Sequence, residues 1–92
     1  MVSKGDHHMK NKEEFKVRLG QLLRRRREDF GYTQESIAYE IGIDPNSYGE
    51  IERGISSPSA ITLYKIHLRT GISIDKLFRE LQQEYPLPED EE

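Results

Sequence analysis

Residues 33–54 read TQESIAYEIGIDPNSYGEIERG, and this stretch decides the fold. Thr33 is a favourable N-cap residue, because its hydroxyl can accept a hydrogen bond from a free N–H group of the first helical turn. The apolar spacing at Ile37 and Ile41 predicts a helix of about two turns. Gly42 can take the positive φ that ends such a helix sharply.

A second short helix follows within the same stretch. Asp44 can cap its N-terminus, and Pro45 falls at the first helical position, where the missing N–H group costs nothing. Tyr48 and Ile51 are spaced to face inward together, and Gly54 ends the helix. Two capped helices joined by a tight turn predict a helix-turn-helix.

The rest of the chain predicts three further helices, one before this stretch and two after it. The first runs from about Lys12 to Phe30, and the fourth begins after a Ser57 N-cap with Pro58 at its first position. The fifth follows a Ser73 N-cap. The residues expected to face inward from the first and fifth helices are Phe15, Leu19, Leu22, Leu23, Phe30, Ile74, Leu77, Phe78 and Leu81.

The two ends of the chain lack helical periodicity. We expect residues 1–11 to form a disordered arm and residues 85–92 to form an acidic disordered tail, in which Pro86 and Pro88 prevent the last helix from continuing. Residues 12–84 then form one domain. The predicted fold is all-α, a compact five-helix helix-turn-helix domain with disordered termini.

Composition limits the function of this domain. With 92 residues the chain can build only a thin core, which leaves no room for a deep catalytic cavity. It contains no Cys, so disulfides and zinc fingers are excluded, as suits a reducing cytoplasm. No apolar run approaches the roughly 20 residues of a membrane span, and no signal peptide is apparent. We therefore expect a cytoplasmic protein with no membrane partner, metal site, cofactor or small-molecule substrate.

The net charge of −3 is unusual for a nucleic-acid binder, but its source is local. Residues 81–92 carry five acidic and no basic side chains. Residues 10–80 carry 13 basic and 11 acidic side chains, which leaves a charge of +2. The helical region is weakly basic, and the excess of negative charge belongs to the C-terminal end.

Four segments together resemble a known family. They are LRRRREDFGYTQESIA (23–38), IGIDPNSYGEIERG (41–54), SPS (57–59) and TGISIDKLF (70–78). At this mutual spacing they are similar to the lambda-repressor-like (Cro/repressor, XRE-type) helix-turn-helix family, and the resemblance covers about two thirds of the chain. It implies five helices, of which the second and third dock on DNA.

The run Arg24–Arg27 wraps most of the circumference of the first helix, so its members cannot all have one role. Arg27 lies four residues after Leu23, on the core side, where an unpaired charge would cost several kcal/mol. The resemblance supplies a partner, because Arg27 and Glu52 match an arginine and a glutamate of the family. We expect a structural ion pair between them.

The resemblance also implies a DNA-binding surface. Gln34 matches a glutamine that binds a phosphate, and the start of the second motif helix lies in the major groove. There Asn46 can pair with adenine, and Glu50 can accept a hydrogen bond from cytosine. Gly49 is a poor helix former, so it either permits a close approach to DNA or is simply tolerated. The residues predicted to bind DNA are Thr33, Gln34, Asp44, Pro45, Asn46, Ser47, Gly49, Glu50 and Arg53.

The function predicted from these features is a sequence-specific DNA-binding transcriptional regulator, a homodimer that binds double-stranded DNA at a two-fold operator. The alternative is a protein-interaction module with little DNA affinity, because Asp44 and Glu50 would repel phosphates. Ile61 and Leu68 occupy one face of the fourth helix and are either an oligomer surface or part of the core. An enzyme is not expected, since no catalytic constellation is evident.

Overall fold

Five α-helices make up the part of the chain that the computed structural model describes, which comprises the backbone of residues 4–86 and the side chains of residues 12–86. No strand occurs in this part, so the prediction of an all-α, five-helix domain is confirmed. The helices are α1 (Lys4–Asp29), α2 (Gln34–Ile41), α3 (Pro45–Glu52), α4 (Ala60–Thr70) and α5 (Ile74–Glu84). None of them is long and apolar enough to cross a membrane.

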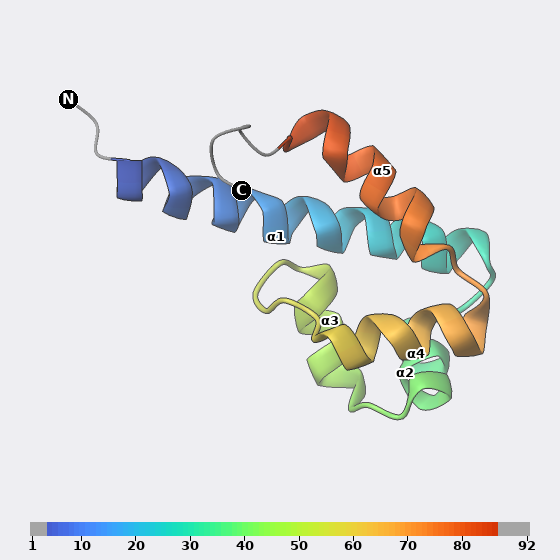
Figure 1. Ribbon diagram of the computed structural model, residues 1–92. Coiled ribbons are helices and arrows are strands. Elements are labelled where there is room, and N and C mark those ends of the chain that lie inside the picture. Colours follow the sequence, from blue (N-terminus) through green and yellow to red (C-terminus); the bar gives the residue numbers. More distant parts are fainter. Residues whose placement is uncertain (1–3, 87–92) are drawn as a thin grey trace.

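The long helix α1 lies between two groups of elements (Figure 1). On one side it packs against α5, and on the other it contacts α3, which belongs to the group of short helices α2, α3 and α4. Because α1 contacts both groups, its buried face must be wide. Leu19, Leu22 and Leu23 supply that face, as predicted.

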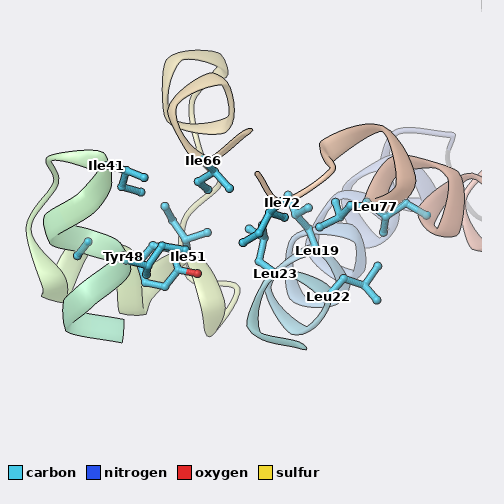
Figure 2. Packing of buried hydrophobic residues seen from close by; sticks show 12 residues of the cluster. Leu19, Leu22, Leu23, Ile41, Tyr48, Ile51, Ile66, Ile72 and Leu77 are labelled. Atoms are coloured by element: carbon cyan, nitrogen blue, oxygen red, sulfur yellow. The ribbon is translucent and has the colours of Figure 1, made fainter. Parts of the chain in front are cut away.

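The core gathers aliphatic side chains from all five helices around one buried tyrosine (Figure 2). Besides the three leucines of α1, its fully buried members are Ile37, Ala38, Ile41, Tyr48, Ile51, Ile66, Ile72, Leu77 and Leu81. Phe30 and Phe78 were expected in this core, but they are 49% and 44% exposed. Phe30 comes after the last turn of α1, and Phe78 lies one residue from Leu77, at the edge of the buried stripe of α5.

The predicted helix starts and stops of the central stretch are confirmed. The Thr33 hydroxyl accepts a hydrogen bond from the N–H group of Ser36 at 3.0 Å, and the Asp44 carboxylate accepts one from the N–H group of Ser47 at 3.2 Å. Gly42 ends α2 in the left-handed conformation with φ +73°. These local hydrogen bonds fix where α2 and α3 begin, and hence which residues of α3 face outward.

Two predicted helix starts are wrong. The N-cap of α4 is Ser59, which accepts from the N–H group of Thr62 at 3.0 Å, so Pro58 precedes the helix. The reason lies upstream, because the N–H group of Ser56 still bonds to the carbonyl of Glu50 at the end of α3. Only residues 57 and 58 then remain as a link, and the second of the two available serines becomes the cap.

The first helix begins at Lys4, although we expected a start near Lys12 after a disordered arm. An established helix extends by one hydrogen bond per residue without a new nucleation cost, and no proline interrupts the segment. Its lack of an apolar stripe hid this extension from the sequence pattern. The predicted disordered tail is wrong at Tyr85, which caps α5 and packs its ring against Phe15 with centroids 5.6 Å apart. Residues 87–92 of that tail lie outside the described residues.

Close packing of α1 on α3 depends on two glycines that we did not single out for this role. A Cβ atom on Gly20 would lie 2.5 Å from the carbonyl oxygen of Ile51. Gly54, with φ +76°, packs against Val17, where a Cβ would lie 2.7 Å from the Val17 Cα. The missing side chains let the end of α3 lie directly on the α1 backbone, and this contact sets the orientation of the second motif helix.

Candidate nucleic-acid interface

The helix α3 has one buried face and one exposed face. Tyr48, Ile51 and Glu52 are buried, so the predicted inward positions of Tyr48 and Ile51 are confirmed. The opposite face is polar and open to solvent, as a helix that enters a DNA groove requires. The predicted DNA-binding residues exposed on or before α3 are Asp44, Pro45, Asn46, Ser47, Glu50 and Arg53.

Behind this face lies the predicted ion pair, which the structure confirms. Arg27 donates two hydrogen bonds to the Glu52 carboxylate, from Nε at 2.6 Å and from Nη2 at 3.1 Å. A third donor of Arg27, Nη1, binds the carbonyl oxygen of Tyr32 at 2.7 Å. The two residues are 7% and 6% exposed. The pair therefore joins α1, the loop before α2 and the last turn of α3 through charge-assisted hydrogen bonds.

Gln34 extends this network to the surface. Its Nε2 donates a hydrogen bond to Glu52 Oε1 at 2.9 Å, which places the half-buried carboxamide between α2 and α3. One Glu52 oxygen thus accepts from both Arg27 and Gln34. The hydrogen bond to the buried carboxylate of Glu52 fixes the orientation of the Gln34 amide. Its neighbour Thr33 is exposed at the start of α2.

The protonation states at this network are shifted by burial and by the pair itself. Burial alone would raise the pKa of the Glu52 carboxyl, but the hydrogen bonds from Arg27 and Gln34 outweigh burial and lower it. The hydrogen bond to Glu52 raises the pKa of Arg27 despite burial. Both groups are charged at neutral pH.

Tyr48 packs beside the ion pair, with its hydroxyl inside the core. Burial, followed by the neighbouring Glu52, raises its pKa well above the ordinary range. The hydroxyl has no hydrogen-bond partner among the described residues. Tyr48 is therefore a neutral packing residue, and its ring holds α3 against the rest of the core (Figure 2).

Gly49 is the one residue of the predicted site that is fully buried. The space its missing side chain leaves is bordered by Arg53 Nη1 at 3.1 Å and Gln34 Oε1 at 3.6 Å from an ideal Cβ position. Its neighbours in the structure are thus side chains of the proposed interface. Gln34, Gly49 and Arg53 come from two helices and meet at one place.

Comparison with known proteins assigns this arrangement to a family. A helix-turn-helix family model matches residues 23–77, more than half of the chain. The control protein C.MunI of a Mycoplasma species is 35% identical over 72 residues, which cover 77% of this chain and 97% of that protein. The chain belongs to the helix-turn-helix family.

Two further relatives agree with this assignment. An uncharacterized HTH-type transcriptional regulator of Bacillus subtilis strain 168, YazB, is 41% identical over 58 residues, 63% of this chain and 84% of that protein. The crystal structure of the restriction-modification controller protein C.AhdI from Aeromonas hydrophila is similar with a TM-score of 0.63 and 34% identity. That match covers 67% of this chain and 94% of the C.AhdI chain. DNA binding and transcription regulation are the function class of these helix-turn-helix proteins.

Within this helix-turn-helix domain the arginine run of α1 is divided among different partners. Arg24 pairs with Glu28 on the same helix at 3.2 Å, and Arg26 pairs with Glu80 of α5. Arg27 holds Glu52 of α3. Only Arg25 of the run has no ion-pair partner among the described residues, and it is exposed. Most of the run therefore stabilises the fold.

The acidic residues of the motif differ in what they do. One carboxylate oxygen of Asp44 accepts a hydrogen bond from the N–H group of Ser47, so the negative charge of Asp44 stabilises the N-terminus of α3. Glu50 is exposed and its carboxylate has no hydrogen-bond partner among the described residues. Glu50 and Arg53 are therefore the opposing charges that the outer face of α3 presents.

Other kinds of site are not indicated in the described part of the chain. No group of three metal-ligating side chains gathers there. An open apolar groove lies between α1 and α5. Figure 1 shows that α5 lies on the side of α1 away from α3. The groove is lined by Phe15, Phe78, Leu81, Gln82, Tyr85 and Pro86, and it offers no set of converging polar groups.

Proposed function

We propose that this protein is a sequence-specific DNA-binding transcription regulator that acts as a homodimer on a two-fold operator. The observation that carries the proposal is the division of α3 into a buried face, anchored by the Arg27–Glu52 pair, and an exposed polar face. A rigidly held helix with free polar side chains suits insertion into the major groove. The family and the transcriptional regulators among the relatives support it.

The exposed residues have different proposed roles. Asn46 and Glu50 are one turn apart and read base edges, since an amide pairs with adenine and a carboxylate accepts from cytosine. Gln34 and Arg53 bind the phosphate backbone, which contributes most of the affinity. The remaining proposed contacts are Thr33 at the start of α2, then Asp44, Pro45 and Ser47 at the start of α3, and Gly49 in the middle of α3.

A homodimer needs a surface, and α4 provides one. Ile61, Tyr64 and Leu68 are 66%, 62% and 62% exposed, and their spacing places them on one face of the helix. This exposure excludes Ile61 and Leu68 from the core and leaves the oligomer surface as the interpretation that we propose. Leu77 and Leu81 of α5 are buried within the chain and are not available to a partner. We place the dimer contact on α4.

The dimer proposal is tested by sedimentation. Wild type at tens of micromolar should sediment as a dimer, and Leu68→Asp should sediment as a monomer with an unchanged helical spectrum. Glu40→Asp, an exposed conservative change on α2, serves as the control. A wild type that stays monomeric both free and on DNA would exclude the homodimer.

A second candidate function is a helix-turn-helix module that binds a partner protein and has little affinity for DNA. One observation favours it, because the structure engages Arg24, Arg26 and Arg27 in ion pairs within the fold. Three of the four arginines in the run 24–27 are therefore engaged within the fold and are less available to phosphates. The two candidates differ in salt dependence, since only phosphate contacts release counterions.

A randomised-site selection, combined with binding to random DNA at two salt concentrations, separates the candidates. Wild type should select a consensus, and Asn46→Ala should lose roughly 1–3 kcal/mol on that site and little on random DNA. Gln34→Ala should weaken all sequences about equally. Glu50→Gln should bind random DNA more tightly, because it removes a charge that faces phosphates. If wild type selects no consensus and its binding is insensitive to salt, the DNA proposal fails.

A further inference from the structure

Gly49 stands at a position where folding alone would favour another residue. It lies inside α3, with a helical backbone, where glycine is less favourable than alanine because it loses more conformational entropy. Gly20 is explained by the α3 backbone that lies against it. The first obstacle to a Cβ at Gly49 is only the guanidinium end of Arg53, which can swing away. The packing of the fold therefore does not require a glycine at this position.

What the glycine does permit is a particular position of Arg53. Nη1 of Arg53 lies 3.1 Å from the ideal Cβ position, which is tighter than most real Cβ contacts, so an added side chain would push the guanidinium away from this position. The guanidinium is thus folded back across α3, over the place where a side chain would stand. Arg53 has no ion-pair partner among the described residues, so its charge is not neutralised within this part of the fold.

The same place is bordered by Gln34. Its Oε1 lies 3.6 Å from the ideal Cβ of Gly49, and its Nε2 is held by Glu52. The Nε2 group has two hydrogens, of which Glu52 takes one, so the other remains available as a donor. The guanidinium of Arg53, at the C-terminal cap of α3, and the carboxamide of Gln34, which turns its oxygen to this place, therefore border the same small space.

We propose that Gly49 is a positioning residue that seats Arg53 beside Gln34, so that the two side chains bind the same phosphate of the DNA backbone. This inference rests on the proposed DNA-binding function and deepens it. A guanidinium and an amide N–H are both donors to phosphate oxygens, and one phosphate offers enough acceptors for both. Gly49 itself makes no contact with a base, so it changes affinity and leaves sequence preference alone.

The test is a double-mutant cycle on random and selected DNA. Gly49→Leu fills the space that Arg53 occupies, and Arg53→Ala removes the guanidinium. If one phosphate contact is lost, affinity at 0.1 M salt falls about eightfold, and the ratio of affinities at 50 and 200 mM salt falls about 3.5-fold. Each single variant should show this loss on both DNAs. The double variant should be no weaker than Arg53→Ala.

Gly49→Ala separates an effect on DNA binding from a loss of folding, because this variant should be more stable than wild type. It should raise the melting temperature by about 4–8 °C, because alanine favours the helix, while DNA affinity falls by a smaller factor than for leucine. Gln83→Ala, an exposed change on α5, should leave both properties unchanged. The double variant Gln34→Ala/Arg53→Ala should lose DNA affinity by a smaller factor than the product of the two single-variant factors, since both residues bind the same phosphate.

The outcomes separate this inference from the function on which it rests. If wild type binds DNA with a salt-sensitive affinity but Gly49→Leu binds equally well, the role of Gly49 is refuted and the proposed function stands. If Gly49→Leu weakens the Arg53→Ala background by the same factor as wild type, it acts by blocking DNA and not through Arg53, which also refutes it. A wild type without salt-sensitive binding removes both.

Discussion

Glu52 is the residue whose replacement tests the structural argument most severely. Its carboxylate accepts two hydrogen bonds from Arg27 and one from Gln34, and it is 6% exposed. Glu52→Gln keeps the volume and removes the charge, which leaves the Arg27 cation buried without its counter-ion. Breaking a buried pair in this way costs about 3–5 kcal/mol. The amide oxygen of the new glutamine can still accept a hydrogen bond from Arg27, so we expect a loss of about 3 kcal/mol in the free energy of unfolding.

This loss is large compared with the stability of the domain. A chain of this size has a free energy of unfolding of roughly 5–14 kcal/mol, and a loss of about 3 kcal/mol corresponds to a fall of about 12–24 °C in melting temperature. Urea unfolding of wild type, Arg27→Met, Glu52→Gln and the double variant measures the coupling. The double variant should be about 1–3 kcal/mol more stable than the sum of the single losses implies.

The chain contains a matched control for this cycle. Asp75 and Arg79 lie on the same helix, α5, and form an ion pair with Nε···Oδ2 3.2 Å, but both side chains are exposed. Arg79→Met, Asp75→Asn and their double variant should show a coupling of at most about 0.5 kcal/mol. Equal coupling energies at the two pairs, or additive losses of stability at Arg27 and Glu52, would refute the argument that burial makes the Arg27–Glu52 pair the stronger one.

The buried pair also predicts the direction of the pH dependence. The pKa of Glu52 is lowered in the folded protein, so its contribution to stability is complete above the unfolded-state pKa of 4.5. That contribution is lost as the pH falls from there through the lower folded pKa. Wild type should therefore lose unfolding free energy more steeply below about pH 4.5 than Glu52→Gln does, as followed by urea titrations across this range.

Two further predictions concern packing and the C-terminal segment. Gly20→Ala should destabilise the domain by about 1–3 kcal/mol in urea unfolding, because its Cβ meets the rigid backbone of α3, and a stabilised variant would contradict this. Removal of residues 87–92, which carry four acidic side chains, should leave the melting temperature almost unchanged and tighten binding to random DNA at low salt. A truncated chain that no longer folds, or that binds DNA no better, would refute the second prediction.

The sequence was sufficient to predict the helix-turn-helix because its signals are local. Thr33 and Asp44 cap helices through hydrogen bonds that span three residues, and the inward positions Tyr48 and Ile51 follow from helical spacing. The start of α4 was missed because Ser57 followed by Pro58 is the usual local signal for a helix start, whereas the hydrogen bonds that close α3 leave Ser59 as the cap.

What the sequence did not predict depends on which surfaces meet in three dimensions. Gly20 reads as a weak helix residue until the backbone of α3 lies against it. Arg26 reads as one more cation of the run until Glu80 of α5 lies beside it. The predicted partner of Arg27 was correct because the family resemblance supplied the distant residue Glu52, which spacing alone could not supply.

The distribution of these arginines limits how the protein can bind DNA. In the described residues, Arg18, Arg24, Arg26 and Arg27 are held by carboxylates of the same chain, and on α3 the positive charge of Arg53 is opposed by Glu50. Each arginine held in this way is less available to a phosphate, and the sequence-independent affinity of a single domain grows with each phosphate neutralised. Two linked domains on two half-sites multiply such weak contacts without adding charge. In the proposed homodimer, the exposed face of α4 contributes to DNA binding together with α3, because it pairs two recognition helices.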